Sequence, residues 1–260
     1  MSARQAALAI LCLADPVAKA AQARALFAGL DDAAIDPAEA LADPGELPGR
    51  PALPRLLHAK AIPSRTPFTP EGRAAMLHAV THIEFNAINL ALDAVWRFTG
   101  MPLAYYRDWL RVASEEALHF TLLSEHLASL GCAYGDFDAH DGLWAMTQRT
   151  AHDITARMAL VPRTLEARGL DAAPPMQAKL RKAGDLRAVE ILDVILRDEV
   201  GHVASGNHWY RWLCARAAHD PVALYAELAV RYEAPRLRPP FNHAARRAAG
   251  FTDAEIALLT

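Results

Sequence analysis

The sequence predicts an all-α protein built around an antiparallel bundle of four long helices. Alanine is abundant and runs of β-branched residues are scarce, which favours helices over strands. No segment alternates apolar and polar residues with period two for long enough to suggest a sheet. Apolar residues make up 53% of the 260 positions, so the chain can bury a sizeable core.

The first two bundle helices have clear boundaries in the sequence. The first is expected to start at Thr69-Pro70, a cap followed by a first-turn proline, and to end before Gly100. The second is expected from about Pro102 to Leu130, and Gly131 should end it. A loop over residues 132–141 follows.

The other two bundle helices are expected to form a second hairpin. The third should run from about Gly142 to Arg168, with a kink at Pro162 and an end at Gly169. Residues 170–184, which contain Pro174 and Pro175, are interpreted as a connection with or without a short helix of its own, and Asp185 as the cap of a fourth helix that reaches about Ala218. Four helices of about 30 residues make a bundle roughly 40 Å long.

We expect three parts in the chain: residues 1–69, a bundle domain over 70–218, and a C-terminal helical extension over 219–260. The first part begins with two short helices within residues 2–29. Seven prolines make residues 30–69 irregular, either as a segment wrapped over the bundle or as a linker. The extension should end in a helix that starts with the capping box Thr252-x-x-Glu255.

Charge and cysteine usage indicate a cytoplasmic protein. The net charge of −3 argues against a protein that coats nucleic acid or an anionic membrane. No apolar run approaches the ~20 residues of a membrane span, and the stretch Ala6–Leu13 is interpreted as a helix and not a signal peptide. The three cysteines are far apart, so we expect buried thiols in a reducing compartment: Cys12, Cys132 and Cys214.

One basic patch departs from this balance near the C-terminus, where arginines outweigh the single Glu233: Arg231, Arg236, Arg238, Arg246 and Arg247. A solvated tail explains such a patch without any ligand.

Two predicted helices carry the same short motif, Glu-x-x-His. Glu116 and His119 lie on one face of the second helix, one turn apart, and Glu199 and His202 do so on the fourth. Both motifs lie within apolar stripes that should face the bundle core. Because a buried carboxylate must be neutralised, paired or metal-bound, we interpret these four residues as metal ligands.

The first and third helices each add a glutamate. Glu84 lies in the middle of an apolar stripe, with no lysine or arginine three or four positions away. Glu166 is less clear, because Arg163 lies one turn away and an Arg163–Glu166 ion pair is an alternative to a ligand role.

The spacing of these residues predicts a centre with two metal ions. The interval from Glu84 to Glu116 is nearly the same as the interval from Glu166 to Glu199, so each hairpin offers Glu and then Glu-x-x-His. Four carboxylates and two imidazoles are the ligand set of di-iron or di-manganese carboxylate centres. Oxygen and nitrogen ligands without thiolate suit iron or manganese better than structural zinc, and we expect two iron ions, with Mn/Fe or Mn as alternatives.

Other polar clusters have simpler interpretations. The loop over residues 136–141 is rich in aspartate but lacks the spacing of a calcium loop, so we interpret it as turns and a helix cap. His78 and His82 lie one turn apart, and a satisfied or exposed pair is favoured over a metal site.

The ligand pattern resembles the ferritin-like di-iron superfamily, which includes ribonucleotide reductase small subunits, multicomponent monooxygenases and di-iron tRNA hydroxylases. Within it, the sequence around the ligands resembles most an uncharacterised bacterial ferritin-like family with a domain of unknown function. The resemblance covers roughly residues 70–218 and is carried by five stretches: His82–Glu84, Glu115–Phe120, Tyr134–Trp144, Pro162–Asp171 and Asp198–His202.

The resemblance implies a ferritin-like bundle with a metal centre, in which the acid before each motif holds the opposite histidine. If this arrangement holds here, the Glu115 carboxylate would accept a hydrogen bond from the His202 ring, and the Asp198 carboxylate one from the His119 ring. Surface acids are the alternative, and for Glu115 a pair with Arg111.

The expected function is an oxygen- or peroxide-activating oxidoreductase for a small organic substrate. An iron-handling ferroxidase or storage protein, a metal-stapled binding protein and a tRNA hydroxylase remain alternatives. The sequence identifies neither the substrate nor the electron donor, and it leaves a homodimer open.

Overall fold

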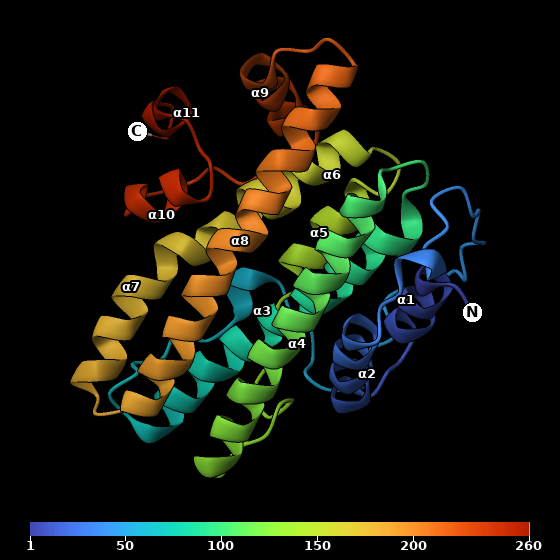
Figure 1. Cartoon of the computed structure of the whole chain (residues 1–260). Helices are drawn as coiled ribbons and strands as arrows, with labels where there is room; N and C mark the ends of the chain where they lie inside the picture. Colours follow the sequence, from blue (N-terminus) through green and yellow to red (C-terminus); the bar gives the residue numbers. More distant parts are fainter. Residues whose placement is uncertain (260) are drawn as a thin grey trace. The chain divides into compact units, whose positions relative to one another are not determined.

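The computed structural model describes residues 1–259, which form two compact units, Met1–Trp144 and the chain from Ala145 onward (Figure 1). The described residues contain helices, irregular segments and a single isolated bridge between Leu56 and Ala139, so the all-α prediction is confirmed. No helix among them is both long enough and apolar enough to cross a membrane. The predicted three-part division of the chain stays a prediction.

The first unit is built on one long helix pair, α3 (Pro70–Arg97) and α4 (Leu103–Ser129), which lie side by side (Figure 1). The Thr69 side chain caps α3 by accepting from the Gly72 N–H, as expected from its sequence. Gly131 has φ +76°, a left-handed conformation that costs glycine little and ends α4. Both boundaries therefore agree with the sequence prediction to within a turn of helix.

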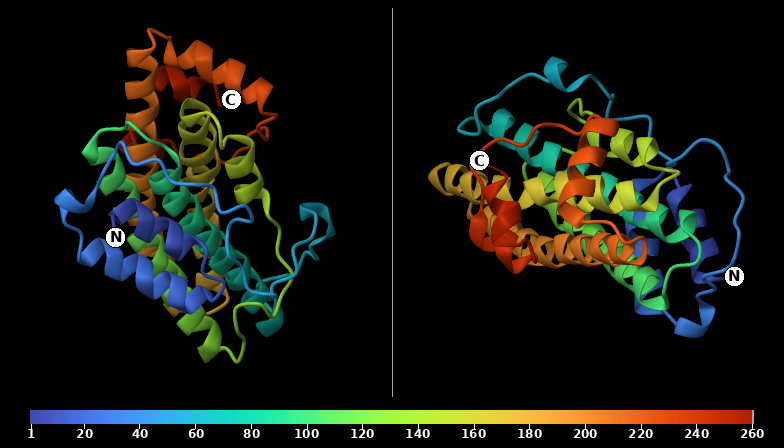
Figure 2. Two further views of the ribbon diagram at one scale, coloured as in Figure 1. Left: turned by 90° about the vertical axis from the view of Figure 1, so that its right-hand side faces the viewer. Right: turned by 90° about the horizontal axis from the view of Figure 1, so that it is seen from above.

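Two N-terminal helices complete the first unit. They are α1 (Ala3–Leu11), which packs against α3, and α2 (Pro16–Ala28), which packs against α4; both are blue in Figure 2. Arg4 is fully buried and donates from Nε to the Val95 carbonyl, near the end of α3, over 3.1 Å. The N-terminal helices are thus an integral part of this unit.

The segment between α2 and α3 is irregular, as its prolines predict. It contains only two short 3-10 turns, η1 (Asp32–Ala34) and η2 (Ala59–Ala61). It is fixed to the unit at several points, for example by Lys19 Nζ, which donates to the Gly49 carbonyl over 2.8 Å. The segment is therefore held to the first unit by hydrogen bonds, and its wrapping over a bundle domain stays a prediction.

The predicted third helix over residues 142–168 is wrong. That stretch holds a short helix α5 (Gly142–Arg149), a second short helix α6 (Ile154–Leu160) and a π-helical segment η3 (Val161–Glu166). The break after α5 arises because Asp153 caps a new helix, accepting from the Ala156 N–H over 2.9 Å.

The predicted end at Gly169 and the connection over 170–184 are also wrong, because α7 (Ala167–Lys182) runs through both and includes Pro174 and Pro175. A proline inside a helix leaves the carbonyl four residues earlier without its usual donor. Here the Leu170 carbonyl accepts from the Asn242 side chain over 3.2 Å, so the segment just before α10 (His243–Ala248) satisfies a group that Pro174 cannot.

The second unit also contains α8 (Leu186–Arg216), which packs beside α7, and three shorter helices: α9 (Pro221–Arg231), α10 (His243–Ala248) and α11 (Asp253–Ala257). Asp185 caps α8, and the capping box of Thr252 and Glu255 starts α11, both as predicted.

Two smaller expectations need correction. Cys12 is exposed, whereas Cys132 is half-buried and Cys214 buried, so the thiols do not share one environment. Arg246 is fully buried and pairs with Asp171 over 2.6 Å, so it does not belong to a solvated basic tail.

Candidate metal centre

The first unit brings three of the predicted ligands together. Glu84 of α3 and Glu116 and His119 of α4 are buried, and one ligand atom from each lies within 4.8 Å of the other two. His119 Nδ1 lies 3.2 Å from Glu84 Oε2 and 3.2 Å from Glu116 Oε2. Two carboxylates and an imidazole directed at one buried point form a group that could hold a metal ion.

The electrostatics of this group favour a bound cation. Burial, followed by the repulsion of the Glu116 carboxylate, raises the pKa of Glu84 to about 8, although the hydrogen bond with His119 opposes this shift. Two ionised carboxylates this close together in a dry interior are unfavourable, because both lose their hydration and their negative charges repel each other. A divalent cation would compensate both of them, and the oxygen and nitrogen donors without thiolate fit iron or manganese.

In the second unit, Glu199 and His202 lie one turn apart on α8, as their motif predicts. His202 Nδ1 lies 3.9 Å from Glu199 Oε2, and both side chains are buried. Glu166, the last residue of η3, is also buried.

A glycine of α7 makes room for Glu199. A Cβ added to Gly169 would lie 3.7 Å from the carboxyl carbon of Glu199, so that carboxylate rests against the glycine. Gly169 follows Glu166 by three residues, and residues three apart share a helix face. Glu166 therefore lies on the side of α7 that Glu199 approaches.

The alternative in which Arg163 pairs with Glu166 is wrong. Arg163 Nη2 bonds Glu255 over 2.7 Å, and its Nη1 donates to the Asn207 side chain. The sequence could not reveal this partner because Glu255 lies 92 residues further along the chain. The sequence showed that Glu255 belongs to a capping box, but it did not show that the same carboxylate also binds Arg163.

The acids that precede each motif make contacts with neighbouring arginines. Arg111 Nη1 lies 3.4 Å from Glu115, and Arg197 Nε donates to Asp198 over 2.8 Å. The pair of Arg111 and Glu115 is the alternative that the sequence suggested. The roles in which Glu115 and Asp198 hold the opposite histidines stay predictions.

His78 and His82 are buried and each makes a hydrogen bond, which supports the interpretation without a metal and excludes exposure, although the buried Nδ1 of His78 has no hydrogen-bond partner among the described residues. His78 Nε2 accepts from the Gly135 N–H over 2.9 Å, and His82 Nδ1 lies 2.9 Å from the Tyr134 hydroxyl. Burial is the main cause that lowers the pKa of His78 to about 4 and that of His82 to about 3. Both imidazoles are therefore neutral at pH 7 and act as hydrogen-bonding core groups.

Asp136 of the loop over 136–141 acts in a turn, as expected, whereas Asp138 and Asp141 form ion pairs that the sequence did not predict. Asp136 accepts from the Ala133 N–H over 2.7 Å. Asp138 pairs with Arg55 and Asp141 with Arg50, each over 2.9 Å. These bonds fix the irregular segment before α3 to the loop after α4.

Comparison with known proteins gives a family but no activity. The model of the family described as "Protein of unknown function (DUF455)" matches residues 12–257. The chain is also 54% identical over 213 residues to an "Uncharacterized protein" of Haemophilus influenzae, an alignment that covers 79% of this chain and 74% of that one. No solved structure matches. With the family model spanning nearly all of its length, the chain belongs to the DUF455 family.

Proposed function

We propose that the protein is a ferritin-like di-iron carboxylate oxidoreductase that activates oxygen or peroxide for reaction with a small organic substrate. The observation that carries this proposal is the buried group of Glu84, Glu116 and His119, whose ligand atoms lie within 4.8 Å of one another. A carboxyl whose pKa is raised to about 8 by burial and a second carboxylate is a group that a cation would stabilise.

The second half of the site is proposed from the likeness of the two helix pairs. Glu116 and Glu199 occupy the same position when each is counted from the first residue of its helix, Leu103 for α4 and Leu186 for α8. In each, a histidine follows three positions later. A further buried glutamate lies on the preceding part of each helix pair: Glu84 within α3, and Glu166 directly before α7. In our proposal the two pairs form a four-helix bundle and the six side chains share two metal ions.

The residues of the chain would have separate tasks in such a centre. Glu84 and Glu116 would neutralise the metal charge, and Glu84 would release its proton when a metal binds. The imidazoles of His119 and His202 would bind as neutral donors. Apolar residues beside them, such as Phe120 and Val203, are buried and would exclude water. Two iron ions would supply the electrons that reduce oxygen or peroxide.

The proposal is tested by loading the protein with Fe²⁺ without oxygen and then measuring oxygen uptake. We expect uptake that depends on iron, and we expect Glu84→Gln and Glu199→Gln to abolish it. Glu190→Gln is the matched control, because Glu190 lies on α8 with a side chain that is 65% exposed and paired with Arg187. Iron-loaded wild-type protein that consumes no oxygen would refute the oxidoreductase. Uptake of iron far beyond two ions per chain would indicate a storage protein instead.

A further inference from the structure

Arg163, near the middle of η3, is held from several sides within the second unit. Its guanidinium lies 4.8 Å from the Phe251 ring centre, 5.2 Å from that of Tyr210 and 5.3 Å from that of Tyr225. It also bonds Glu255, and its side chain is 4% exposed. A buried arginine held by a carboxylate and three rings has little freedom to move.

Glu255 has several partners, so it links η3 to the C-terminal chain. One oxygen bonds Arg163, and the other accepts from Arg211 of α8 and from the Thr252 N–H, over 2.7 and 2.8 Å. The net effect of these donors lowers the pKa of Glu255 although burial, the largest single influence, would raise it. The carboxylate is therefore charged at neutral pH.

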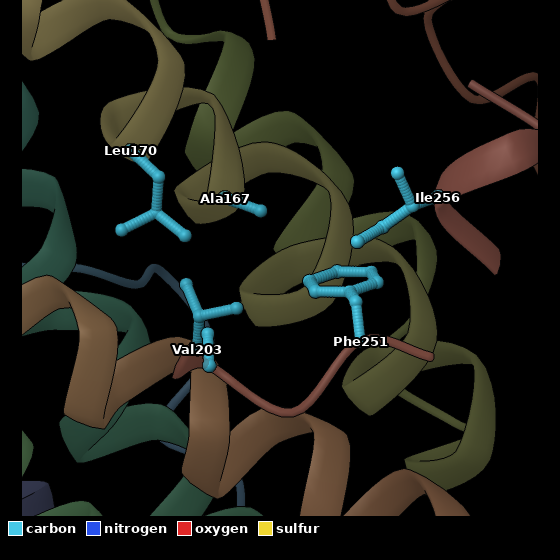
Figure 3. Close-up of a cluster of buried hydrophobic side chains, with 6 residues drawn as sticks. Ala167, Leu170, Val203, Phe251 and Ile256 are labelled. Atoms are coloured by element: carbon cyan, nitrogen blue, oxygen red, sulfur yellow. The ribbon is translucent and has the colours of Figure 1, made fainter. Parts of the chain in front are cut away.

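Apolar contacts attach the same part of the C-terminal chain to α7 and α8. Phe251 and Ile256 belong to a buried cluster with Ala167, Leu170 and Val203 (Figure 3). Ala167 is the residue that follows Glu166, so this cluster lies directly beside the end of η3. We refer to residues 249–257 as the C-terminal anchor.

The π-helical form of η3 has its own local causes. Pro162 cannot donate a backbone hydrogen bond, and the Thr164 hydroxyl donates to the Ala159 carbonyl, five residues earlier, over 2.8 Å. The Pro162 ring also lies so close to α8 that a Cβ at Gly206 would be 2.5 Å from it. Segments of this kind are short and strained, and they occur often at functional sites.

The form of η3 decides where Glu166 points. A π-helical turn holds one residue more than an α-helical turn, and one residue corresponds to about 100° of rotation around a helix. Relaxation of η3 to an α-helix would therefore rotate Glu166, together with the α7 face on which Gly169 meets Glu199, relative to α6, although α6 and α7 both pack against α8.

We propose that the C-terminal anchor, through Glu255 and Arg163, keeps η3 in its π-helical form and so directs Glu166 into the metal centre. Glu255 is thus a positioning residue for a ligand and not a ligand itself. The proposal rests on the proposed function for the metal, but the effect on η3 does not depend on any metal.

The test uses Glu255→Gln, which keeps a capping-box side chain but removes the charge that Arg163 faces. In metal-free protein we expect the backbone amides of residues 161–167 to exchange hydrogen at least about tenfold faster than in the wild type. In titrations with Fe²⁺ under nitrogen, we expect affinity to fall about tenfold or more at one metal position and to stay unchanged at the other.

Asp253→Asn is the control, because Asp253 lies on the same helix but is 83% exposed and pairs with the exposed Arg247. It should change neither measurement. Exchange in Glu255→Gln that equals the control would overturn the role of the anchor. Faster exchange with both metal affinities unchanged would overturn the positioning of Glu166. A wild type that binds no metal would refute the proposed function, while the exchange result would still decide whether Glu255 holds η3.

Discussion

The two long helix pairs, α3 with α4 and α7 with α8, offer the same types of side chain but differ in how the first helix of each is built. Glu84 lies inside a continuous helix of 28 residues. Glu166 ends a six-residue π-helical segment that connects α6 to α7. The second helices are alike, since α4 and α8 place Glu-x-x-His at the same position from their first residues.

The difference shows two ways to fix a buried carboxylate. Glu84 is fixed by the regular burial of one face of α3, in which Ala87 and Ile88 are almost fully buried. Glu166 instead depends on a polar network, since Arg163 three residues before it is bound to Glu255. We therefore expect the first half of the site to be robust and the second half to be sensitive to distant changes.

The largest expected effect concerns the two histidines. His119→Ala and His202→Ala should each weaken metal binding by more than about 100-fold, beyond the loss typical of outer-shell partners. The metal-free variants should stay helical and lose less than about 3 kcal/mol of stability, because apolar burial dominates a domain of this size. Metal titration and thermal unfolding of the metal-free proteins check both statements. Equal loss of helicity in both variants without metal would make these histidines structural.

The next effect tests whether Glu166 plays the same role beside α7 and α8 that Glu84 plays in the pair of α3 and α4. Glu166→Gln should reduce affinity at one metal position by about 10- to 100-fold, and it should leave the stability of the metal-free protein nearly unchanged. Arg163→Gln should destabilise the metal-free protein by several kcal/mol, because it leaves Glu255 buried with a weakened partner. If Glu166→Gln still bound two metal ions fully, Glu166 would not be a ligand, and the two helix pairs would not be equivalent.

Two glycines of the second pair should respond differently to the same change. Gly206→Ala should cost about 1–3 kcal/mol, because its Cβ would lie 2.5 and 2.7 Å from the rigid Pro162 ring. Gly169→Ala should be neutral or slightly stabilising, because its nearest contact would be an ordinary 3.7 Å and alanine favours helices. Thermal unfolding distinguishes them, and similar melting temperatures would contradict the close approach at Pro162.

A further effect is a pH dependence in the first pair. Between the ordinary pKa of 4.5 and the raised value of about 8, folded Glu84 keeps a proton that the unfolded chain has lost. The stability of metal-free wild-type protein should therefore fall as the pH rises through this range. Glu84→Gln carries no such proton, so its stability relative to the wild type should increase from pH 5 to pH 8. If the stability of both proteins changed with pH in the same way, the pKa of Glu84 would not be raised in the folded protein.

Much of the first pair could be predicted from the sequence because its signals are local. Thr69 and Pro70 mark the start of α3, and Gly131 marks the end of α4. The Glu-x-x-His motif and the apolar periodicity around it predicted Glu84, Glu116 and His119 as candidate ligands, and these three side chains do come together.

The second pair was predicted less well because distant residues override its local signals. Pro174 looked like the mark of a connection, but Asn242 supplies the donor that the Leu170 carbonyl needs within α7. Arg163 offered an alternative partner for Glu166, but Glu255 binds it. Such bonds between residues far apart in the chain leave no pattern in a single sequence.

The central claim is that the chain binds two metal ions. It is tested most directly by elemental analysis of protein purified from its native host, with the double variant His119→Ala, His202→Ala purified in parallel. We predict two metal ions per chain, chiefly iron, in the wild type and almost none in the double variant. A wild-type protein with one metal ion or none per chain, or a double variant with unchanged metal content, would contradict the account.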